Sequence, residues 1–366
     1  MLATGTMRLC NRILFTLLLI TTVPLLGQAA PAGGAAAAQK PAAQAPLTVD
    51  RDPVRSPDAG GNVTTPGETP LQKQGKGFVL HTTVDEVVLN ATVLEGHKLV
   101  PNLAQNDFQV YEDGVKQTIL SFQHTDLPVS LGLVIDNSGS MYKKRPAVNA
   151  AAIDLVQSSN PDDQAFVVNF SDESFLDEDF TSNVGQLRQG LAHIDSRGGT
   201  ALYDAVAASA DHLVEQGTRP KQVLVVITDG DDNASTLTLE QAIRRVQDLS
   251  GPEIYTIGLL YGDEMSREEV RHAKRALEML ADETGGIAFF PKSLNQVDEI
   301  AGEVARDIRN QYTIGYRSTK PMSEGGFRRV EVTAEAKGMG KLTVRTRPGY
   351  FPSVPLHKRQ VEARGQ

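Results

Sequence analysis

The middle of the chain alternates short apolar runs with helical stretches. Three of the runs are continuous and rich in β-branched residues: SLGLVID (130–136), QVLVVIT (222–228) and IYTIGL (254–259). Strands of a parallel sheet that is covered on both faces have this composition. Helical patterns are predicted at 142–159, 201–216, 239–250, 267–284 and 294–309. Strands separated by helices in this order predict an α/β domain with a doubly wound, mainly parallel sheet.

Strand-like patterns continue outside this core. AFVVNF (165–170), a turn and ESFLDEDF (173–180) predict a central strand followed by an antiparallel edge strand. Before the α/β region, residues 78–94 alternate apolar and polar side chains, and 107–122 predicts a hairpin turning at Asp113-Gly114. After it, strand-like patterns occur at 311–318, 327–336 and 341–347.

The two β-rich ends are expected to belong together. Neither end has enough strands for a stable sheet with its own core. Because the termini of a domain usually lie close together, an α/β domain can be inserted into a β-structure without breaking it. We therefore expect β-sandwich-like strands from both ends of the chain to flank the α/β domain.

The N-terminus has the pattern of an exported protein. Arg8 and Arg12 precede a short apolar run, and the small residues around Ala29 fit a signal-peptidase site. A retained N-terminal anchor is the alternative. The predicted organisation is a signal peptide at 1–29, a disordered Ala/Pro/Gly-rich linker at 30–75, an N-terminal β-rich part at 76–126, an α/β domain at 127–310, a C-terminal β-rich part at 311–351 and a tail at 352–366. The expected location is secreted, periplasmic or cell-envelope, with no integral membrane span after cleavage.

Charge and cysteine content exclude several classes of partner and site. The chain has 45 Asp and Glu against 36 Lys and Arg, a formal charge of −9, so nucleic-acid binding is not expected. Its only cysteine, Cys10, lies in the predicted signal peptide. The mature chain would therefore have neither a disulfide nor a thiolate metal site.

Oxygen-bearing side chains follow the predicted strands. Asp136, Ser138 and Ser140 come after the first strand, Asp229 follows another, and Thr200 precedes a helix after Gly198-Gly199. Ligands bind open parallel sheets at the carboxyl ends of their strands, so these side chains should share one edge. All the groups are hard oxygens, which suit Mg²⁺, with Mn²⁺ or Ca²⁺ as alternatives. Two carboxylates and three hydroxyls would leave one coordination position of the metal open to solvent.

These loops resemble the metal-ion-dependent adhesion site (MIDAS) of von Willebrand factor A (VWA) domains. The family pattern is Asp-x-Ser-x-Ser with a later Thr and a later Asp, and all five positions are filled here. The resemblance implies that Ser138, Ser140 and often Thr200 touch the metal, while Asp136 and Asp229 act largely through water. It also implies that a partner's carboxylate completes the metal shell. The segments NDFQVYEDGVKQ and QYTIGY…RPGYF resemble the flanks of bacterial secreted VWA proteins.

Residues beside these loops allow two interpretations. Asp231 and Asp232 would form an adjacent cation site or a solvated acidic loop. Asp204 would steady the threonine loop or face solvent, and Arg197 would orient a partner carboxylate or remain a surface charge. Tyr142 and Lys143 are candidates for the edge of a contact face.

The predicted function is that of a metal-dependent protein-binding module for adhesion or assembly, which binds an acidic side chain of a partner protein. The alternative is a structural envelope protein in which the metal only stabilises the fold and the β flanks make the contacts. No nucleophile elbow, P-loop or dinucleotide fingerprint is present, so the chain is not expected to be an enzyme or to have catalytic residues. Nothing in the sequence indicates an oligomeric state.

Overall fold

The computed structural model describes residues 86–249, 251–261 and 265–352. All of these described residues belong to one unit of the chain. The predicted signal peptide with Cys10, the predicted linker, the first part of the 78–94 strand and the tail beyond residue 352 lie outside the described residues. Within the described ranges, no helix combines the length and the apolar character that a membrane span needs.

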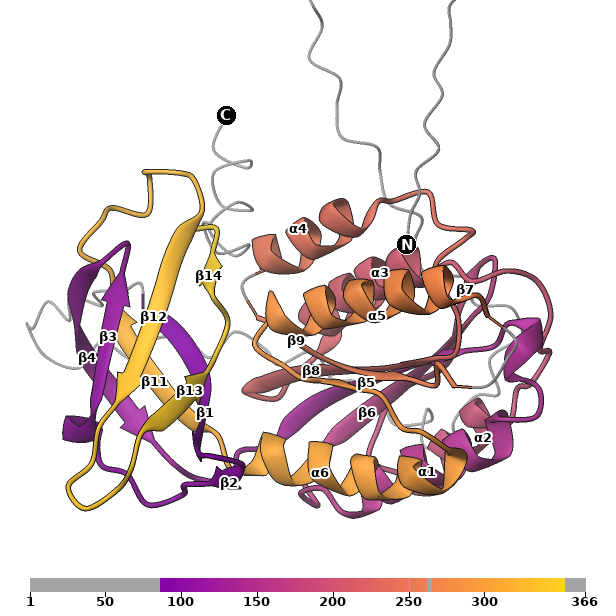
Figure 1. Cartoon of the computed structure of the whole chain (residues 1–366), viewed down its shortest axis with the longest axis horizontal. Coiled ribbons are helices and arrows are strands. Elements are labelled where there is room, and N and C mark those ends of the chain that lie inside the picture. Colours follow the sequence, from indigo (N-terminus) through magenta and orange to yellow (C-terminus); the bar gives the residue numbers. More distant parts are fainter. Residues whose placement is uncertain (1–85, 250, 262–264, 353–366) are drawn as a thin grey trace, which may run out of the picture. The chain divides into compact units, whose positions relative to one another are not determined.

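A six-stranded sheet forms the centre of the α/β domain (Figure 1). Its order is β10-β9-β8-β5-β6-β7, and all neighbours are parallel except β7, which runs antiparallel to β6. Every residue of β5 is buried, as expected for an apolar run that packs on both faces. The doubly wound fold and its antiparallel edge strand are thus confirmed. The strands are β5 (Val129–Asp136), β6 (Gln164–Phe170), β7 (Ser174–Thr181), β8 (Lys221–Thr228), β9 (Glu253–Gly258) and β10 (Ala288–Phe289).

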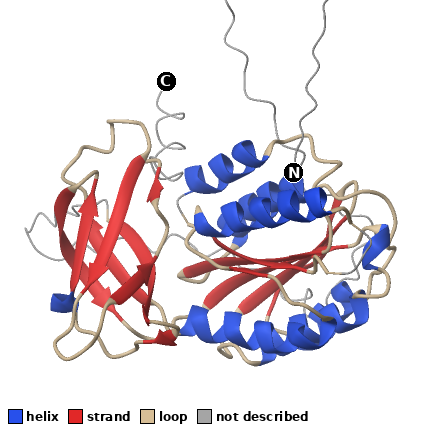
Figure 2. Cartoon of the chain, viewed as in Figure 1, coloured by secondary structure: helices blue, strands red, loops and turns tan. Residues whose placement is uncertain are grey.

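Helices cover both faces of this sheet (Figures 1 and 2). Each face has its own apolar core, to which three helices contribute buried side chains. One face is covered by α1 (Arg145–Gln157), α2 (Val184–Leu191) and α6 (Val297–Arg309). The other is covered by α3 (Leu202–Gln216), α4 (Leu239–Leu249) and α5 (Arg267–Asp282).

The helix predictions differ from the structure at α1, at α2 and at α6, the last of which begins at Val297 and not at residue 294. Helix α1 begins at Arg145 and not at residue 142, because the short 3₁₀ helix η2 (Gly139–Met141) precedes it. Pro146 in the first turn suits that later start, since proline is tolerated where the N–H needs no partner. Helix α2 is not predicted, because its eight residues include two glycines, which are weak helix formers. Two further 3₁₀ helices are η1 (Gln105–Asp107) and η3 (Leu294–Gln296).

The two β-rich ends form a single antiparallel sheet, as Figure 1 shows. Strand β1 from the N-terminal end pairs with β11 and β13, and β3 pairs with β12, so the expectation that the two ends belong together is confirmed. The strands form one curled eight-stranded sheet, in the order β13-β1-β11-β4-β3-β12-β14 with β2 beside β1. They are β1 (Val87–Glu95), β2 (Lys98–Leu99), β3 (Phe108–Glu112), β4 (Val115–Gln123), β11 (Tyr312–Arg317), β12 (Arg328–Ala334), β13 (Leu342–Arg345) and β14 (Gly349–Tyr350).

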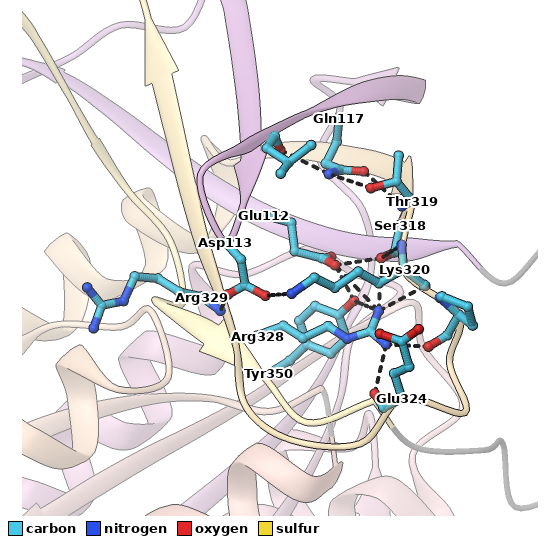
Figure 3. Close-up of polar contacts among 12 residues, drawn as sticks. Glu112, Asp113, Gln117, Ser318, Thr319, Lys320, Glu324, Arg328, Arg329 and Tyr350 are labelled. Atoms are coloured by element: carbon cyan, nitrogen blue, oxygen red, sulfur yellow. Dashed lines mark hydrogen bonds and ion pairs between the residues drawn. The ribbon is translucent and has the colours of Figure 1, made fainter.

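A buried polar cluster joins β3, β12 and β14 in this sheet (Figure 3). Glu112 and Arg328 are both almost fully buried, and the Glu112 carboxylate accepts hydrogen bonds from the hydroxyls of Tyr316 (2.8 Å) and Tyr350 (2.9 Å). The Arg328 guanidinium lies 3.4 Å from Glu112. It also donates to backbone carbonyls of the loop after β11, those of Lys320 (3.2 Å), Pro321 (2.6 Å) and Glu324 (3.0 Å). Neighbouring Asp113 and Lys320 form an ion pair.

Candidate metal centre

Three loops meet at the carboxyl edge of the six-stranded sheet. Strands β5 and β8 are adjacent and parallel, with Ile135 paired to Ile227 near their ends. Asp136 is the last residue of β5, and Asp229 directly follows β8. The loop that ends in Thr200 leads into α3, and the backbone N–H groups of Asn233 and Ala234, beyond β8, donate to the Thr200 carbonyl at 3.0 and 3.3 Å. The five predicted site residues therefore lie at one edge of the sheet, with Asp136 at the end of β5 and the other four in the segments that follow β5 and β8 or precede α3.

Asp136 is completely buried and accepts two hydrogen bonds. Its Oδ1 accepts the backbone N–H of Ser138 at 2.8 Å, and its Oδ2 accepts the Thr228 hydroxyl at 2.6 Å. Burial raises its pKa to about 6, although these hydrogen bonds act in the opposite direction, and the nearby charge of Asp229 adds to the increase. The carboxyl of Asp136 is thus held in one orientation at the base of the loop.

The two serines connect Asp136 to Asp229. The hydroxyl oxygens of Ser138 and Ser140 are 3.2 Å apart, and Ser140 donates to Oδ1 of Asp229 at 2.7 Å. Ser138 and Asp229 are buried, whereas Ser140 is exposed. Two hydroxyls and one carboxylate therefore form a continuous group of oxygens that opens to solvent at Ser140.

Thr200 is placed by two glycines that have little room around them. Gly198 has a φ of +82°, a conformation that favours glycine, and a Cβ on Gly199 would lie 2.5 Å from the Asn233 side-chain oxygen. That same oxygen accepts the Thr200 N–H at 2.9 Å. The Thr200 hydroxyl lies near the loop after β8, 3.4 Å from where a Cβ on Gly230 would stand. The Gly-Gly-Thr sequence thus lets the threonine loop approach the aspartate loop.

Asn137 turns away from the oxygen group and holds the neighbouring loop. Its side-chain oxygen accepts the Ser196 N–H at 3.3 Å, and its backbone carbonyl accepts the Arg197 N–H at 3.2 Å. Its own N–H donates to the Phe170 carbonyl at 2.6 Å. Asn137 therefore links the loop after β5 to the segment that leads to Thr200.

Two cationic side chains beside the site were not among the predicted residues. Lys144 lies with its Nζ 2.6 Å from Oδ2 of Asp229. Arg145 is fully buried and donates to the backbone carbonyls of Asp136 at 3.2 Å and Leu191 at 3.0 Å. Burial lowers the Arg145 pKa to about 10, and the charge of Asp136 opposes that shift. Lys144 and Arg145 directly follow the Asp-x-Ser-x-Ser loop, which could have indicated that they belong to the site. A basic pair at the start of a helix is usually exposed to solvent, however, so the sequence did not single them out.

The acidic residues after Asp229 are engaged in contacts of their own. Asp231 pairs with His272 at 2.7 Å, and Asp232 accepts the Tyr203 N–H at 3.2 Å and the Ser235 hydroxyl at 2.5 Å. Asp204 accepts the backbone N–H groups of Thr236 and Leu237 at 2.8 and 2.9 Å, so it steadies the loop after β8. The carboxylates of Asp231 and Asp232 therefore bind side chains and backbone groups of the protein itself.

The side chains at the edge of the site are exposed. The side chain of Arg197 is 82% exposed and 3.9 Å from Asp195, and Tyr142 is 68% exposed. Lys143 is exposed as well.

The donor set fits a hard divalent cation. Carboxylate and hydroxyl oxygens are the ligands that Mg²⁺ prefers, and here they come from three loops at one edge. In the described part of the chain, no group of three or more His, Cys, Asp or Glu is arranged to hold a metal, so any site here depends on the hydroxyls. The ammonium of Lys144 already lies against Asp229, which shows that this carboxylate is oriented toward a positive charge.

Comparison with known protein families gives a match within the α/β region of the chain. Residues 131–231 match the family model of the von Willebrand factor type A domain. The matched range contains all five predicted site residues, from Asp136 to Asp229. No curated protein sequence matches the chain.

Several solved structures are similar to the chain at low identity. The PilB minor pilin from Streptococcus sanguinis is 13% identical with a TM-score of 0.40, and the alignment covers 50% of this chain and 62% of the pilin, less than two thirds of its length. A von Willebrand factor type A protein from Catenulispora acidiphila is 14% identical with a TM-score of 0.42, covering 68% and 74%. Proximal thread matrix protein 1 from the mussel byssus, with a zinc-occupied MIDAS motif, is 19% identical with a TM-score of 0.40, covering 55% and 50%.

Proposed function

Because the chain carries a von Willebrand factor type A domain, we propose that it is a metal-dependent protein-binding module that acts in adhesion or assembly at the cell envelope. Ser138, Ser140 and Thr200 hold a divalent cation, with Mg²⁺ as the preferred ion. Asp136 and Asp229 supply the negative charge around it. An acidic side chain of the partner protein completes the metal shell.

The main support for this proposal is that hydroxyl and carboxylate oxygens from separate loops lie close together at one edge of the sheet. The Ser140 hydroxyl, 89 residues away from Asp229 in sequence, donates to its carboxylate at 2.7 Å. The exposure of Ser140 gives a ligand access from solvent, while the buried Asp136 and Asp229 remain fixed beneath it. A cation bound by these residues would supply a positive charge that attracts a carboxylate of the partner protein.

The surroundings of the site suit a protein partner. Tyr142 and Arg197 are exposed on segments next to the site, and a hollow of about 320 Å³ borders Asn137, Arg197 and Gly198. Aromatic residues and arginine are enriched where proteins meet. The metal contact would anchor the partner, and the loops at Asn137, at Arg197 to Thr200 and at Gly230 to Asn233 would select it.

The proposed location at the cell envelope fits the proposed binding role. The N-terminal pattern that predicts export supports a partner in the envelope or outside the cell. No catalytic role is assigned to any residue of the site. Turnover of a phosphoester or peptide panel by the full chain, lost in Asp136→Ala, would contradict the binding role.

The proposal is tested by partner capture from an envelope extract. The full chain is crosslinked to the extract in Mg²⁺, in EDTA and in EDTA followed by excess Mg²⁺, and partners are quantified by mass spectrometry. We expect a partner that is recovered with Mg²⁺, falls by at least about tenfold in EDTA and returns when Mg²⁺ is restored. Asp136→Ala and Ser140→Ala should show the EDTA result at every Mg²⁺ concentration.

Ser293→Ala is the matched control, because Ser293 is an exposed serine of the same domain whose side chain makes no capping hydrogen bond. It should capture the partner as the unmodified chain does. Capture that survives both EDTA and the Ser140→Ala change would overturn the proposal. If EDTA then lowered only the melting temperature, the metal would have the purely structural role, and the β-sheet strands would be the place to seek contacts.

A further inference from the structure

A lysine ammonium lies against one of the proposed metal-site carboxylates. Lys144 immediately precedes α1, four residues after Ser140. Its Nζ is 2.6 Å from Oδ2 of Asp229, while Ser140 donates to Oδ1 of the same carboxylate at 2.7 Å. Each oxygen of Asp229 therefore has a donor, and one of the two donors carries a full positive charge.

This ion pair is shielded from solvent. The side chain of Lys144 is 12% exposed and that of Asp229 is 0% exposed. Apolar side chains from the segment after β9 and from α5, among them Leu259, Met265 and Val270, line a small cavity together with Lys144 and Asp229. The Lys144 ammonium also lies 5.8 Å from the centre of the Tyr261 ring. Charges in such surroundings interact more strongly than charges on an open surface, because little water screens them.

The position of Lys144 has two opposite consequences for a cation site. Without a metal, the ammonium compensates the buried charge of Asp229, which would otherwise be costly to keep in the fold. A divalent ion that approaches Asp229 meets a positive charge at ion-pair distance from the same carboxylate. The ion must therefore overcome this repulsion or displace the lysine, and either effect weakens its binding.

We propose that Lys144 is a built-in counter-cation of the metal centre: it neutralises Asp229 in the metal-free domain and competes with the divalent ion for that carboxylate. Lys144 thereby lowers the metal affinity of the site and keeps the metal-free domain folded. This inference depends on the metal site of the proposed function, but it concerns metal binding alone and needs no partner.

The test compares two adjacent lysines in the full chain. Lys144→Met removes the ammonium and keeps an apolar chain of similar length, and Lys143→Met makes the same change at an exposed neighbour. Mg²⁺ and Mn²⁺ affinities are measured by calorimetric titration, and melting temperatures are measured in EDTA and in saturating Mg²⁺. We expect Lys144→Met to bind Mg²⁺ at least about tenfold more tightly than the unmodified chain. Lys143→Met should not differ from it.

The melting temperatures provide a second, independent measurement. Lys144→Met should melt below the unmodified chain in EDTA, and the difference should disappear or reverse in saturating Mg²⁺. If Lys144→Met folds only when Mg²⁺ is present, the counter-cation role is supported directly, and Lys144→Gln serves for the titration. An unchanged or weaker Mg²⁺ affinity in the folded Lys144 variants would overturn the inference.

The two proposals fail in different ways. If no chain binds a divalent ion, the metal site is absent and both proposals fall. If metal binding shifts as expected but no partner is captured with Mg²⁺, only the partner-binding role is contradicted and the counter-cation remains.

Discussion

Asp136 is the residue whose surroundings most limit what the site can do. Complete burial raises the pKa of its carboxyl to about 6, whereas the Thr228 hydroxyl and the Ser138 N–H favour the charged form. A cation beside the carboxyl would favour the charged form further. The two hydrogen bonds therefore keep the carboxylate oriented, and near neutral pH they keep it ready for a metal.

Replacing Thr228 tests this orientation. Thr228→Val keeps the shape of the side chain but leaves Oδ2 of Asp136 without its 2.6 Å donor. We expect the free energy of unfolding to fall by about 1–3 kcal/mol, because a buried acceptor loses its partner. Mg²⁺ affinity, measured by calorimetric titration, should fall several-fold.

Thr256→Val on the neighbouring strand β9 is the control. Thr256 is equally buried, but its hydroxyl donates to the Leu277 carbonyl, away from the site. Thr256→Val should lower the free energy of unfolding without weakening the binding of Mg²⁺. Equal Mg²⁺ affinities in Thr228→Val and the unmodified chain would show that Thr228 does not orient the carboxylate.

Glu253, at the start of β9, gives a prediction about pH. Burial raises the pKa of its carboxyl above the ordinary value of 4.5, although a hydrogen bond from Gln311 and the charge of Lys221 oppose the shift. Between pH 4.5 and the raised pKa, the folded chain keeps a proton that the unfolded chain has lost. The contribution of Glu253 to the free energy of unfolding therefore falls as pH rises through that window.

Glu253→Gln should remove this fall. Urea unfolding at a series of pH values from about 4.5 upward should give a flatter stability profile than that of the unmodified chain. Glu303→Gln, a change at an exposed position of α6, should keep the original slope. Identical slopes for the Glu253 variant and the unmodified chain would contradict the prediction.

The sequence predicted the positions of the proposed ligands better than the contacts of the residues next to them. Hydroxyl and carboxyl side chains directly after apolar strands pointed to one edge, and the structure places them there. The ion pair of Lys144 and the burial of Arg145 were not predicted, because a basic pair at a helix start is usually exposed and their partners Asp229 and Leu191 are 85 and 46 residues away. The assignment of the five residues as metal ligands stays a prediction.

Unbroken apolar runs predicted the strands of the six-stranded sheet well, because β5, β8 and β9 are buried on both faces. Short elements with little apolar pattern were missed. Strand β14 has two residues, and it is defined only by its pairing with β12. Such an element is created by the tertiary structure and not by its own residues.

The cluster in Figure 3 predicts unequal effects for two adjacent arginines of β12. Arg328→Met leaves Glu112 buried without its cation and removes donors from the carbonyls of the loop after β11. We expect it to lower the free energy of unfolding by about 3–5 kcal/mol. Arg329→Met changes an exposed side chain and should cost less than about 0.5 kcal/mol. Urea unfolding measures the free energy of unfolding of both variants. Equal losses in the two variants would show that the cluster does not stabilise the sheet.

In the β-sheet formed by the two ends of the chain, the order of the strands was harder to predict than their existence. Alternating patterns showed that both ends contain strands, and the need for a core suggested that they pair. The order β13-β1-β11-β4-β3-β12-β14 depends on the pairs β1–β11, β1–β13 and β3–β12, whose strands are more than 200 residues apart in sequence. Local patterns do not specify which of several similar strands become neighbours, and so the order of the strands in the curled sheet was not predicted.

This strand order predicts that the N-terminal strands need the C-terminal ones. Strand β1 is paired with β11 on one side and with β13 on the other, so a chain that ends at Asn310 leaves β1 without either partner. The β3–β4 hairpin would remain alone, and an isolated hairpin is at best marginally stable in water. Limited proteolysis of this truncated chain should therefore cut within residues 86–126, whereas a chain that ends at Pro352 and keeps β11 to β14 should resist cleavage there. Resistance of both chains in that region would mean that the N-terminal strands fold on their own and that the sheet does not require both ends.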